Sequence, residues 1–282
     1  MKLVRFGSAG AERPGLALTG GSIVDVSDVI PDLALKALSP ESLERVRAAD
    51  VSKLPRAPEG ARLGPCVGSV GKFIAIGLNY ADHAAETGAK IPAEPIVFMK
   101  ATSCIVGPND TVLKPRGSTK MDWEVELGVV IGKLARYVSE ADAPAHIAGY
   151  CVVNDISERA FQLERGGQWD KGKGCDTFGP IGPWLVTKDE VKDFNNLDMW
   201  LEVNGKRYQN GSTKTMVYKV PFLVSYLSQF MSLQPGDVIS TGTPPGVGLG
   251  MKPPVFLKEG DVIELGIDKL GSQKQLVKRT QI

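Results

Sequence analysis

The chain has 282 residues, and its hydrophobic fraction of 43% supplies enough apolar side chains for one large domain or two small ones. Its 33 basic and 32 acidic residues give a net charge of +1, which excludes the electrostatic footprint of a nucleic-acid or anionic-membrane binder. The four cysteines form no CxxC pair, which argues against a zinc site or a disulfide framework. Because the sequence also lacks a signal peptide and any apolar run of about 20 residues, it predicts a soluble, cytoplasmic protein.

Residues 1–65 are predicted to form a small β-rich N-terminal domain and a linker. Short apolar runs separated by glycine and proline within residues 1–30 predict antiparallel strands. Ser39, followed by proline, predicts the N-cap of a helix of about ten residues. Residues 51–65 are rich in proline, arginine, glycine and alanine, which is typical of a linker. We therefore predict a second, larger domain over residues 66–282.

The second domain begins with a strand and a short helix that carry the first polar candidates. Residues 72–77 predict a strand, and the residues after Asp82 predict a helix that ends at Gly88. On such a helix His83 and Glu86 are surface neighbours. A carboxylate beside an imidazole fixes its tautomer and raises its basicity, as a general base requires. From the spacing alone, an incidental pair on an exposed helix is the commoner explanation.

A second pair of acidic residues lies in the stretch from Asp122 to Gly132. Apolar and β-branched residues after Glu124 predict a strand, on which Glu124 and Glu126 point to the same face. Two adjacent carboxylates raise each other's pKa unless a cation lies between them, so the pattern indicates a metal site. The competing explanation is a solvated strand face, and it is favoured while the motif stands alone because most acidic side chains meet water.

A third carboxylate, Asp155, follows the predicted strand over residues 149–154. An acid at this position is usually a turn former or an N-cap. However, its distance in sequence from Glu126 is long enough for a crossover and a return to the neighbouring strand. Three carboxylates from adjacent strands would offer oxygen ligands only, which suit Mg²⁺, Mn²⁺ or Ca²⁺ better than zinc or copper.

The glycine-rich segment over residues 165–180 has little periodicity. It predicts a mobile loop that carries Lys171 and Lys173, and a solvated basic loop is the simplest explanation of it. Residues 241–248, Thr-Gly-Thr-Pro-Pro-Gly-Val-Gly, lack the Gly-Lys-Ser/Thr of a nucleotide-binding loop. Their N–H groups and hydroxyls could still bind a carboxylate, although an ordinary turn-rich loop explains them equally well.

Two further elements are predicted in the C-terminal half. Residues 197–209 predict a hairpin, whose Asn-Gly turn has the signature of type I′. Residues 218–231 form the longest apolar helical pattern and are predicted to lie in the core.

Six segments in this order resemble the fumarylacetoacetate hydrolase family. They are G-L-N-Y-A-D-H-A-A-E (77–86), D-W-E-V-E-L-G-V-V-I-G (122–132), G-Y-C-V-V-N-D-I-S-E-R (149–159), K-G-K-G-C-D-T-F-G-P (171–180), V-N-G (203–205) and I-S-T-G-T-P-P-G-V-G (239–248). The resemblance extends from about Phe73 to Gly266, which is most of the chain. It implies a mixed α/β, β-rich fold, with a catalytic domain of the family's β-roll type after the small N-terminal domain, and it implies a homodimer.

The resemblance also implies roles for individual residues. It implies that Glu124, Glu126 and Asp155 hold Mg²⁺, with Mn²⁺ or Ca²⁺ as alternatives. It implies that His83, assisted by Glu86, is the general base and that both lie on a lid ordered by substrate. It implies that Lys173 is the catalytic lysine, with Lys171 as its alternative. The residues implied to bind the substrate are Arg159, Gln162 and Thr243.

The implied activity is metal-dependent hydrolysis of a carbon–carbon bond in a β-diketo acid. The substrate would be an acylpyruvate or a 2,4-diketo-3-deoxy sugar acid, cleaved to pyruvate and a second acid by water that His83 and Glu86 activate. Ureidoglycolate lyase, oxaloacetate decarboxylase and isomerase activities are alternatives, because related proteins use the same ligand set for them. A non-catalytic metal- or ligand-binding protein is the alternative of another class, and the His83/Glu86 pair argues against it.

Overall fold

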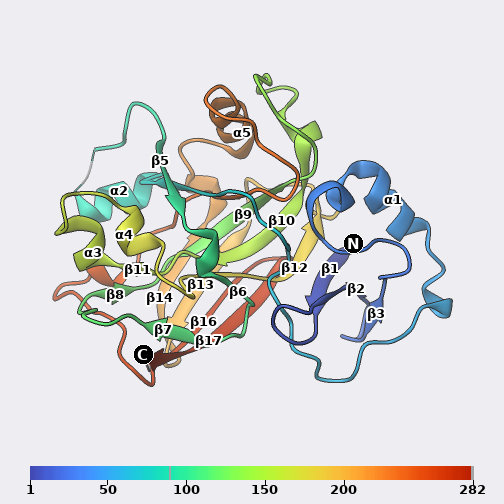
Figure 1. The fold of residues 1–282 in the computed structure, drawn as a ribbon. Coiled ribbons are helices and arrows are strands. Elements are labelled where there is room, and N and C mark those ends of the chain that lie inside the picture. The colour runs from blue at the N-terminus through green and yellow to red at the C-terminus, as the bar shows by residue number, and fades with distance from the viewer. Residues whose placement is uncertain (89, 281–282) are drawn as a thin grey trace.

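The computed structural model describes residues 1–88 and 90–280, and its largest element is a ten-stranded mixed sheet (Figure 1). Nine strands follow one another in space: β3 (Ile23–Asp25), β2 (Arg13–Ala17), β1 (Lys2–Phe6), β12 (Gly179–Thr187), β10 (Ile147–Asn154), β9 (Val125–Ile131), β15 (Val238–Ser240), β4 (Phe73–Gly77) and β5 (Ile96–Lys100). The tenth strand, β6 (Ile105–Val106), pairs with β12. The mixed α/β, β-rich class is confirmed.

A second sheet packs against the centre of the first. It consists of β14 (Lys206–Ser212), β13 (Asp198–Val203), β16 (Val262–Ile267), β17 (Gly271–Arg279) and β7 (Val112–Lys114), and a separate small sheet pairs β8 (Met121–Asp122) with β11 (Ser157–Glu158). The predicted hairpin is confirmed as β13 and β14, because Asn204 and Gly205 have φ angles of 51° and 75°. A positive φ at both turn residues is what a type I′ turn requires.

Helices lie at the margins of the sheets (Figure 1). The α-helices are α1 (Pro40–Ala48), α2 (Ala81–Thr87), α3 (Arg159–Leu163), α4 (Asp170–Lys173) and α5 (Val220–Ser228). Short 3-10 turns are η1 (Leu35–Leu38), η2 (Val51–Lys53), η3 (Thr102–Cys104), η4 (Ala143–His146), η5 (Lys188–Glu190), η6 (Thr213–Thr215) and η7 (Gly248–Gly250). The helix predicted over residues 218–231 is shorter, and only one of its faces is buried.

The two central strands, β9 and β10, are buried along their whole length. Strands β13 and β16 of the second sheet pack against β9, and β16 and β17 pack against β10. A strand covered on both faces consists of a nearly continuous apolar run instead of an alternating pattern. Glu126 therefore lies in the interior, and a solvated strand face does not explain the two glutamates.

The N-terminal strands are antiparallel, as predicted, and they extend the large sheet. Leu3 of β1 lies opposite Leu185 of β12, so the hydrogen-bond ladder continues from the first strand into the centre of the molecule. The N-cap of α1 is also as predicted, since the Ser39 hydroxyl accepts from the Ser42 N–H. Because β1 and β12 share one sheet, the N-terminal domain as a separate unit over residues 1–65 stays a prediction.

No helix within residues 1–88 and 90–280 is both long enough and apolar enough to cross a bilayer. The cytoplasmic location and the homodimer stay predictions.

A buried chain of amides connects the second sheet to the first. Gln275 on β17 donates from Nε2 to Pro108 O and Gln273 Oε1, at 2.5 and 2.9 Å, and its Oε1 accepts from Asn154 Nδ2 at 3.0 Å. Asn154 Oδ1 in turn accepts from the Glu124 N–H at 3.3 Å. The position of Glu124 at the start of β9 therefore depends on the packing of the two sheets.

We predict that Gln275→Leu lowers the free energy of unfolding by about 3 kcal/mol, because it leaves several buried polar groups without a partner. The neighbouring Lys274 is mostly exposed, so Lys274→Leu is a matched control and is expected to change stability by less than about 0.5 kcal/mol. Urea denaturation of both variants measures the difference. Equal midpoints would show that the amide chain contributes nothing to the packing.

Candidate functional site

Three carboxylates meet where β9 begins and β10 ends. Glu124 precedes β9, Glu126 lies within it, and Asp155 directly follows β10, which pairs antiparallel with β9. The Asp155 N–H donates to Glu124 O at 2.9 Å, which closes the end of this strand pair. One oxygen from each side chain lies within 4.8 Å of the others, and all three residues are buried. The structure thus brings together the residues that the sequence suggested as metal ligands.

Two cations compensate the charge of Glu124. Lys173 Nζ donates to Glu124 Oε2 at 2.6 Å and to Asp155 Oδ2 at 2.7 Å, and the Arg159 guanidinium donates to Glu124 Oε1 at 2.7 Å. Burial acts to raise the pKa of Glu124, but Lys173 and Arg159 outweigh it and lower the pKa to about 2. Glu124 is therefore a carboxylate that stays ionised at any physiological pH.

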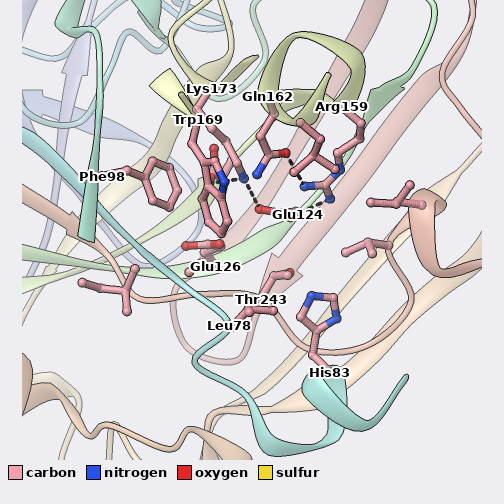
Figure 2. A pocket seen from close by; sticks show the side chains of 16 residues that line it. Leu78, His83, Phe98, Glu124, Glu126, Arg159, Gln162, Trp169, Lys173 and Thr243 are labelled. Atoms are coloured by element: carbon pink, nitrogen blue, oxygen red, sulfur yellow. Dashed lines mark hydrogen bonds and ion pairs between the residues drawn. The ribbon is translucent and has the colours of Figure 1, made fainter. Parts of the chain in front are cut away.

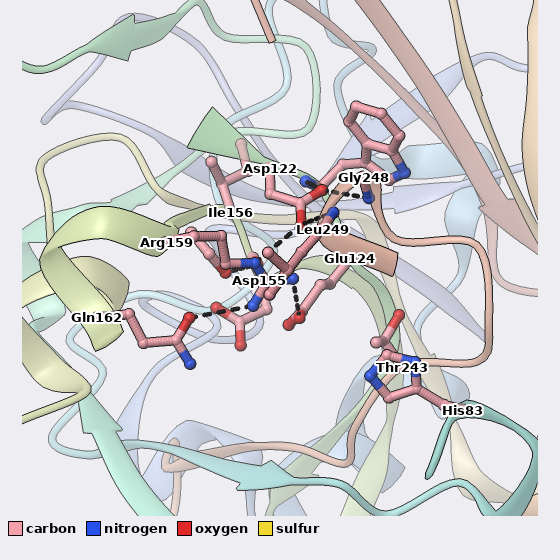
Figure 3. Close-up of polar contacts among 12 residues, drawn as sticks. His83, Asp122, Glu124, Asp155, Ile156, Arg159, Gln162, Thr243, Gly248 and Leu249 are labelled. Atoms are coloured by element: carbon pink, nitrogen blue, oxygen red, sulfur yellow. Dashed lines mark hydrogen bonds and ion pairs between the residues drawn. The ribbon is translucent and has the colours of Figure 1, made fainter. Parts of the chain in front are cut away.

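Arg159 is itself held in place by two more side chains, as Figure 3 shows. Its Nε donates to Asp122 Oδ2 at 2.8 Å, and its Nη1 donates to Gln162 Oε1 at 3.1 Å. Burial acts to lower the pKa of the guanidinium, but Glu124 and Asp122 reverse this effect and raise it. Asp122 was not identified from the sequence, where it only begins the strand motif.

Glu126 differs from Glu124, because among the described residues no ion pair reaches it. Its Oε2 accepts from the Ser240 hydroxyl at 2.6 Å and from the Gly242 N–H at 2.8 Å. Burial raises the pKa of Glu126 well above its usual value, and the charges of Asp155 and Glu124 raise it further. A divalent cation between the three carboxylates would supply the compensating charge.

Lys100, at the end of β5, was missed by the sequence analysis. Its side chain is completely buried, and its Nζ donates to Asp155 Oδ1, to Lys173 O and to Ile156 O. Lys100 thus fixes one oxygen of Asp155, and the other oxygen accepts from Lys173. The available signal was a lysine that ends an apolar strand, but this is more often a side chain that reaches solvent.

The prediction of a mobile loop for residues 165–180 is wrong around Lys173. This residue ends the short helix α4 and is only 2% exposed. Gly172 permits the burial, because a Cβ there would lie 2.5 Å from Glu158 O. Lys171 is exposed, and its Nζ donates to Arg165 O at 2.7 Å. The geometry therefore places Lys173, and not Lys171, beside the carboxylates.

His83 and Glu86 form a directed pair on α2. His83 Nδ1 lies 3.3 Å from Glu86 Oε2, and both Glu86 oxygens lie 3.1 Å from the Gly246 N–H, which donates to them. His83 is only 7% exposed and lines the same cavity as the three carboxylates, with its ring at the edge nearest Thr243 (Figure 2). His83 therefore does not lie on an exposed helix face, and its role as a base stays a prediction.

The loop over residues 241–248 binds carboxylates of the protein itself. Three of its glycine N–H groups donate to three different acidic side chains: Gly242 to Glu126, Gly246 to Glu86 and Gly248 to Asp122. The Thr243 hydroxyl donates to Val125 O at 2.9 Å and accepts from Gln209 Nε2 at 2.8 Å. This loop fixes the carboxylates relative to one another, which its sequence alone did not show.

The cavity has a volume of about 310 Å³ and contains all but one of the sequence-predicted site residues in its lining. Those in the lining are His83, Glu124, Glu126, Asp155, Arg159, Gln162, Lys173 and Thr243, whereas Glu86 lies behind His83. A buried carboxylate cluster beside an imidazole can bind a hard cation and activate water in one cavity.

Residues 72–278 match the family model "Fumarylacetoacetate (FAA) hydrolase C-terminal". A protein of Burkholderia ambifaria named "Putative hydrolase" is 63% identical over 276 residues, which are 98% of each chain.

Two solved structures show what similar proteins bind and do. A maleylpyruvate hydrolase from Sphingobium sp. SYK-6, in complex with manganese(II) and pyruvate, superposes with a TM-score of 0.82 and 31% identity over 100% of both chains. A 5-carboxymethyl-2-hydroxymuconate delta-isomerase from Mycobacterium smegmatis superposes with a TM-score of 0.78 and 31% identity, again over 100% of both chains. Both a hydrolase and an isomerase are thus similar to this chain over its whole length.

We predict that Lys100→Met lowers the free energy of unfolding by roughly 3 kcal/mol, because it leaves the buried carboxylate of Asp155 without one of its cations. Lys171→Met, at an exposed position of α4, is the matched control and is expected to change stability by less than about 0.5 kcal/mol. Urea denaturation of the metal-free variants measures both effects. Equal losses in the two variants would mean that Lys100 does not hold Asp155.

Proposed function

The chain belongs to the fumarylacetoacetate hydrolase family and is a hydrolase of that type, and from this premise we propose that it cleaves a carbon–carbon bond in an acylpyruvate. The products are pyruvate and a second carboxylic acid. The observation that carries this proposal is the single cavity that joins three buried carboxylates to the His83/Glu86 pair. The manganese and pyruvate bound by the related maleylpyruvate hydrolase support it.

The donor set fits a hard divalent cation, proposed to be Mg²⁺ with Mn²⁺ or Ca²⁺ as alternatives. Glu124, Glu126 and Asp155 supply only oxygens, which Mg²⁺, Mn²⁺ and Ca²⁺ prefer. The repulsion that raises the pKa of Glu126 is also what such a cation would relieve. When bound, the cation supplies Lewis-acid polarisation of the adjacent oxygens of a 2-oxo acid.

The His83/Glu86 pair is proposed to activate water. His83 removes a proton from a water molecule in the cavity, and Glu86, 3.3 Å from Nδ1, stabilises the imidazolium that forms. Because the Gly246 N–H binds Glu86, the carboxylate is held in position for this role. The hydroxide adds to the distal carbonyl carbon of the substrate. The lid movement expected for this segment stays a prediction.

The remaining polar residues bind the substrate and the charge that develops on it. As the bond between carbons 3 and 4 breaks, its electron pair passes to carbon 3 and forms the enolate of pyruvate, which takes a proton from the imidazolium. The Lys173 ammonium stabilises the developing negative charge. Gln162 uses its Oε1 to accept from Arg159, so its amide Nε2 is the group that donates to the carboxylate of the substrate.

We predict that the protein with Mg²⁺ consumes acetylpyruvate, with one pyruvate released per diketone lost. Absorbance of the diketone and a coupled pyruvate assay measure the two quantities, and oxaloacetate, ureidoglycolate and an unsaturated 2-hydroxy dicarboxylate complete the panel. Turnover of one of these three, without turnover of any diketo acid, would replace the hydrolase with a decarboxylase, a lyase or an isomerase. Metal binding without any turnover would favour a non-catalytic binding protein.

We also predict that His83→Ala lowers kcat/KM for the diketo acid by about 10²–10⁴-fold, because a positioned general base contributes this much. The affinity for Mn²⁺, measured by calorimetry, should change by less than about threefold, because His83 is not one of the proposed metal ligands, which are all carboxylates. His146→Ala is the control, since His146 is the other histidine of the chain and does not line the cavity. Full activity in His83→Ala would exclude His83 as the base.

A further inference from the structure

One side of the cavity is apolar, and the proposed chemistry does not use it. We define the apolar wall as Phe98 and Trp169, which line the cavity together with the backbone of Gly77. Figure 2 shows Phe98 and Trp169 on one side of Glu124, with Arg159 on the opposite side. A substrate whose carboxylate lies toward Arg159 and Gln162 would therefore extend its acyl end toward this wall.

The wall is built from segments that also carry the catalytic groups. Trp169 packs directly on Gly77, because a Cβ at this glycine would lie 2.5 Å from Cζ3 of the indole. The rings of Phe98 and Trp169 meet edge to face with centroids 5.3 Å apart. Trp169 O accepts from the Lys173 N–H at 3.1 Å, so the indole and the catalytic lysine share one helical turn. The wall is thus fixed relative to the carboxylates.

Arg159 and Lys173 line the cavity, but they direct their hydrogen bonds to carboxylates and not toward the apolar wall. Arg159 donates to Asp122 and Glu124, and Lys173 donates to Glu124 and Asp155. Lys173 Nζ lies 5.3 Å from the centroid of Phe98, but its hydrogen bonds point to the carboxylates. A second carboxylate placed against this wall would lose water without gaining a counter-charge from it, which is costly.

We propose that the apolar wall selects the acyl group, so that the substrates are acylpyruvates with a small, uncharged, apolar acyl chain. This inference rests on the proposed function and adds the class of substrate. The cavity of about 310 Å³ is at the lower end of ligand-pocket volumes, which favours a short alkyl or a single aryl group. Acylpyruvates with a second carboxylate, and sugar acids with a chain of hydroxyls, are disfavoured because their polar groups meet only apolar side chains there.

The test compares two substrates that differ at one group. Butanoylpyruvate ends in a methyl where succinylpyruvate ends in a carboxylate. The wild-type protein is expected to favour butanoylpyruvate by about 100-fold in kcat/KM, and to favour it over acetylpyruvate by roughly threefold for each added methylene. A wild-type preference for succinylpyruvate, or equal rates for the two, would overturn the proposal.

Trp169→Arg places a cation on the wall and is expected to lower the preference for butanoylpyruvate over succinylpyruvate by at least about tenfold. Phe230→Arg is the control, because Phe230 lies on the outside of the protein, 64% exposed, and does not line the cavity. The control should retain the wild-type ratio. A folded Trp169→Arg variant with an unchanged ratio of kcat/KM for the two substrates would show that the wall does not select the acyl group.

A binding measurement separates failure of this inference from failure of the proposed function. Calorimetry with Mn²⁺ compares 2-oxohexanoate with 2-oxoadipate, which differ by the same methyl and carboxylate and cannot be cleaved as β-diketones. If no diketo acid is turned over, the hydrolase proposal fails, but tighter binding of 2-oxohexanoate by tenfold or more still supports the wall. Equal binding, or tighter binding of 2-oxoadipate, contradicts it.

Discussion

The site depends on burying four carboxylates with three cations in one small volume. Asp122, Glu124, Glu126 and Asp155 are the anions, and Lys100, Arg159 and Lys173 are the cations. Each ion costs several kcal/mol to remove from water, so the arrangement is stable only where every charge has its partners in good geometry. Glu126 is the member whose negative charge has no ion pair among the described residues. The proposed cation would therefore compensate the charge of Glu126.

This requirement explains why distant segments converge on the ends of β9 and β10. Lys100 comes from β5, Arg159 from α3 and Lys173 from α4, and the loop over residues 241–248 adds glycine N–H groups. The same loop also donates a hydrogen bond to Glu86, so it positions both the proposed metal ligands and the His83/Glu86 pair. Displacement of any one segment would leave a buried charge without its partner, which gives the site its rigidity.

Local patterns predicted much of the fold and part of the site. The hairpin at Asn204 and the cap at Ser39 depend on neighbouring residues, so the sequence was sufficient for them. The insertion of β15 between β9 and β4 depends on pairing between distant strands and was not predictable. Lys173 was predicted to lie in a loop because its short helix has no periodic apolar pattern in the sequence. That helix is stabilised instead by ion pairs and packing. The spacing of Glu124 and Glu126 alone favoured a solvated strand face, and only the resemblance to a family favoured a metal site.

The central claim is that three carboxylates, now shared with Lys173, form the binding site of one divalent cation. Crystals grown with Mn²⁺ and pyruvate, measured at the manganese absorption edge, test it most directly. The account predicts a single anomalous peak in the cavity, bonded at about 2.0–2.3 Å to one oxygen each of Glu124, Glu126 and Asp155. A cavity without such a peak, in which Lys173 still bridges Glu124 and Asp155 while manganese lies elsewhere, would contradict it.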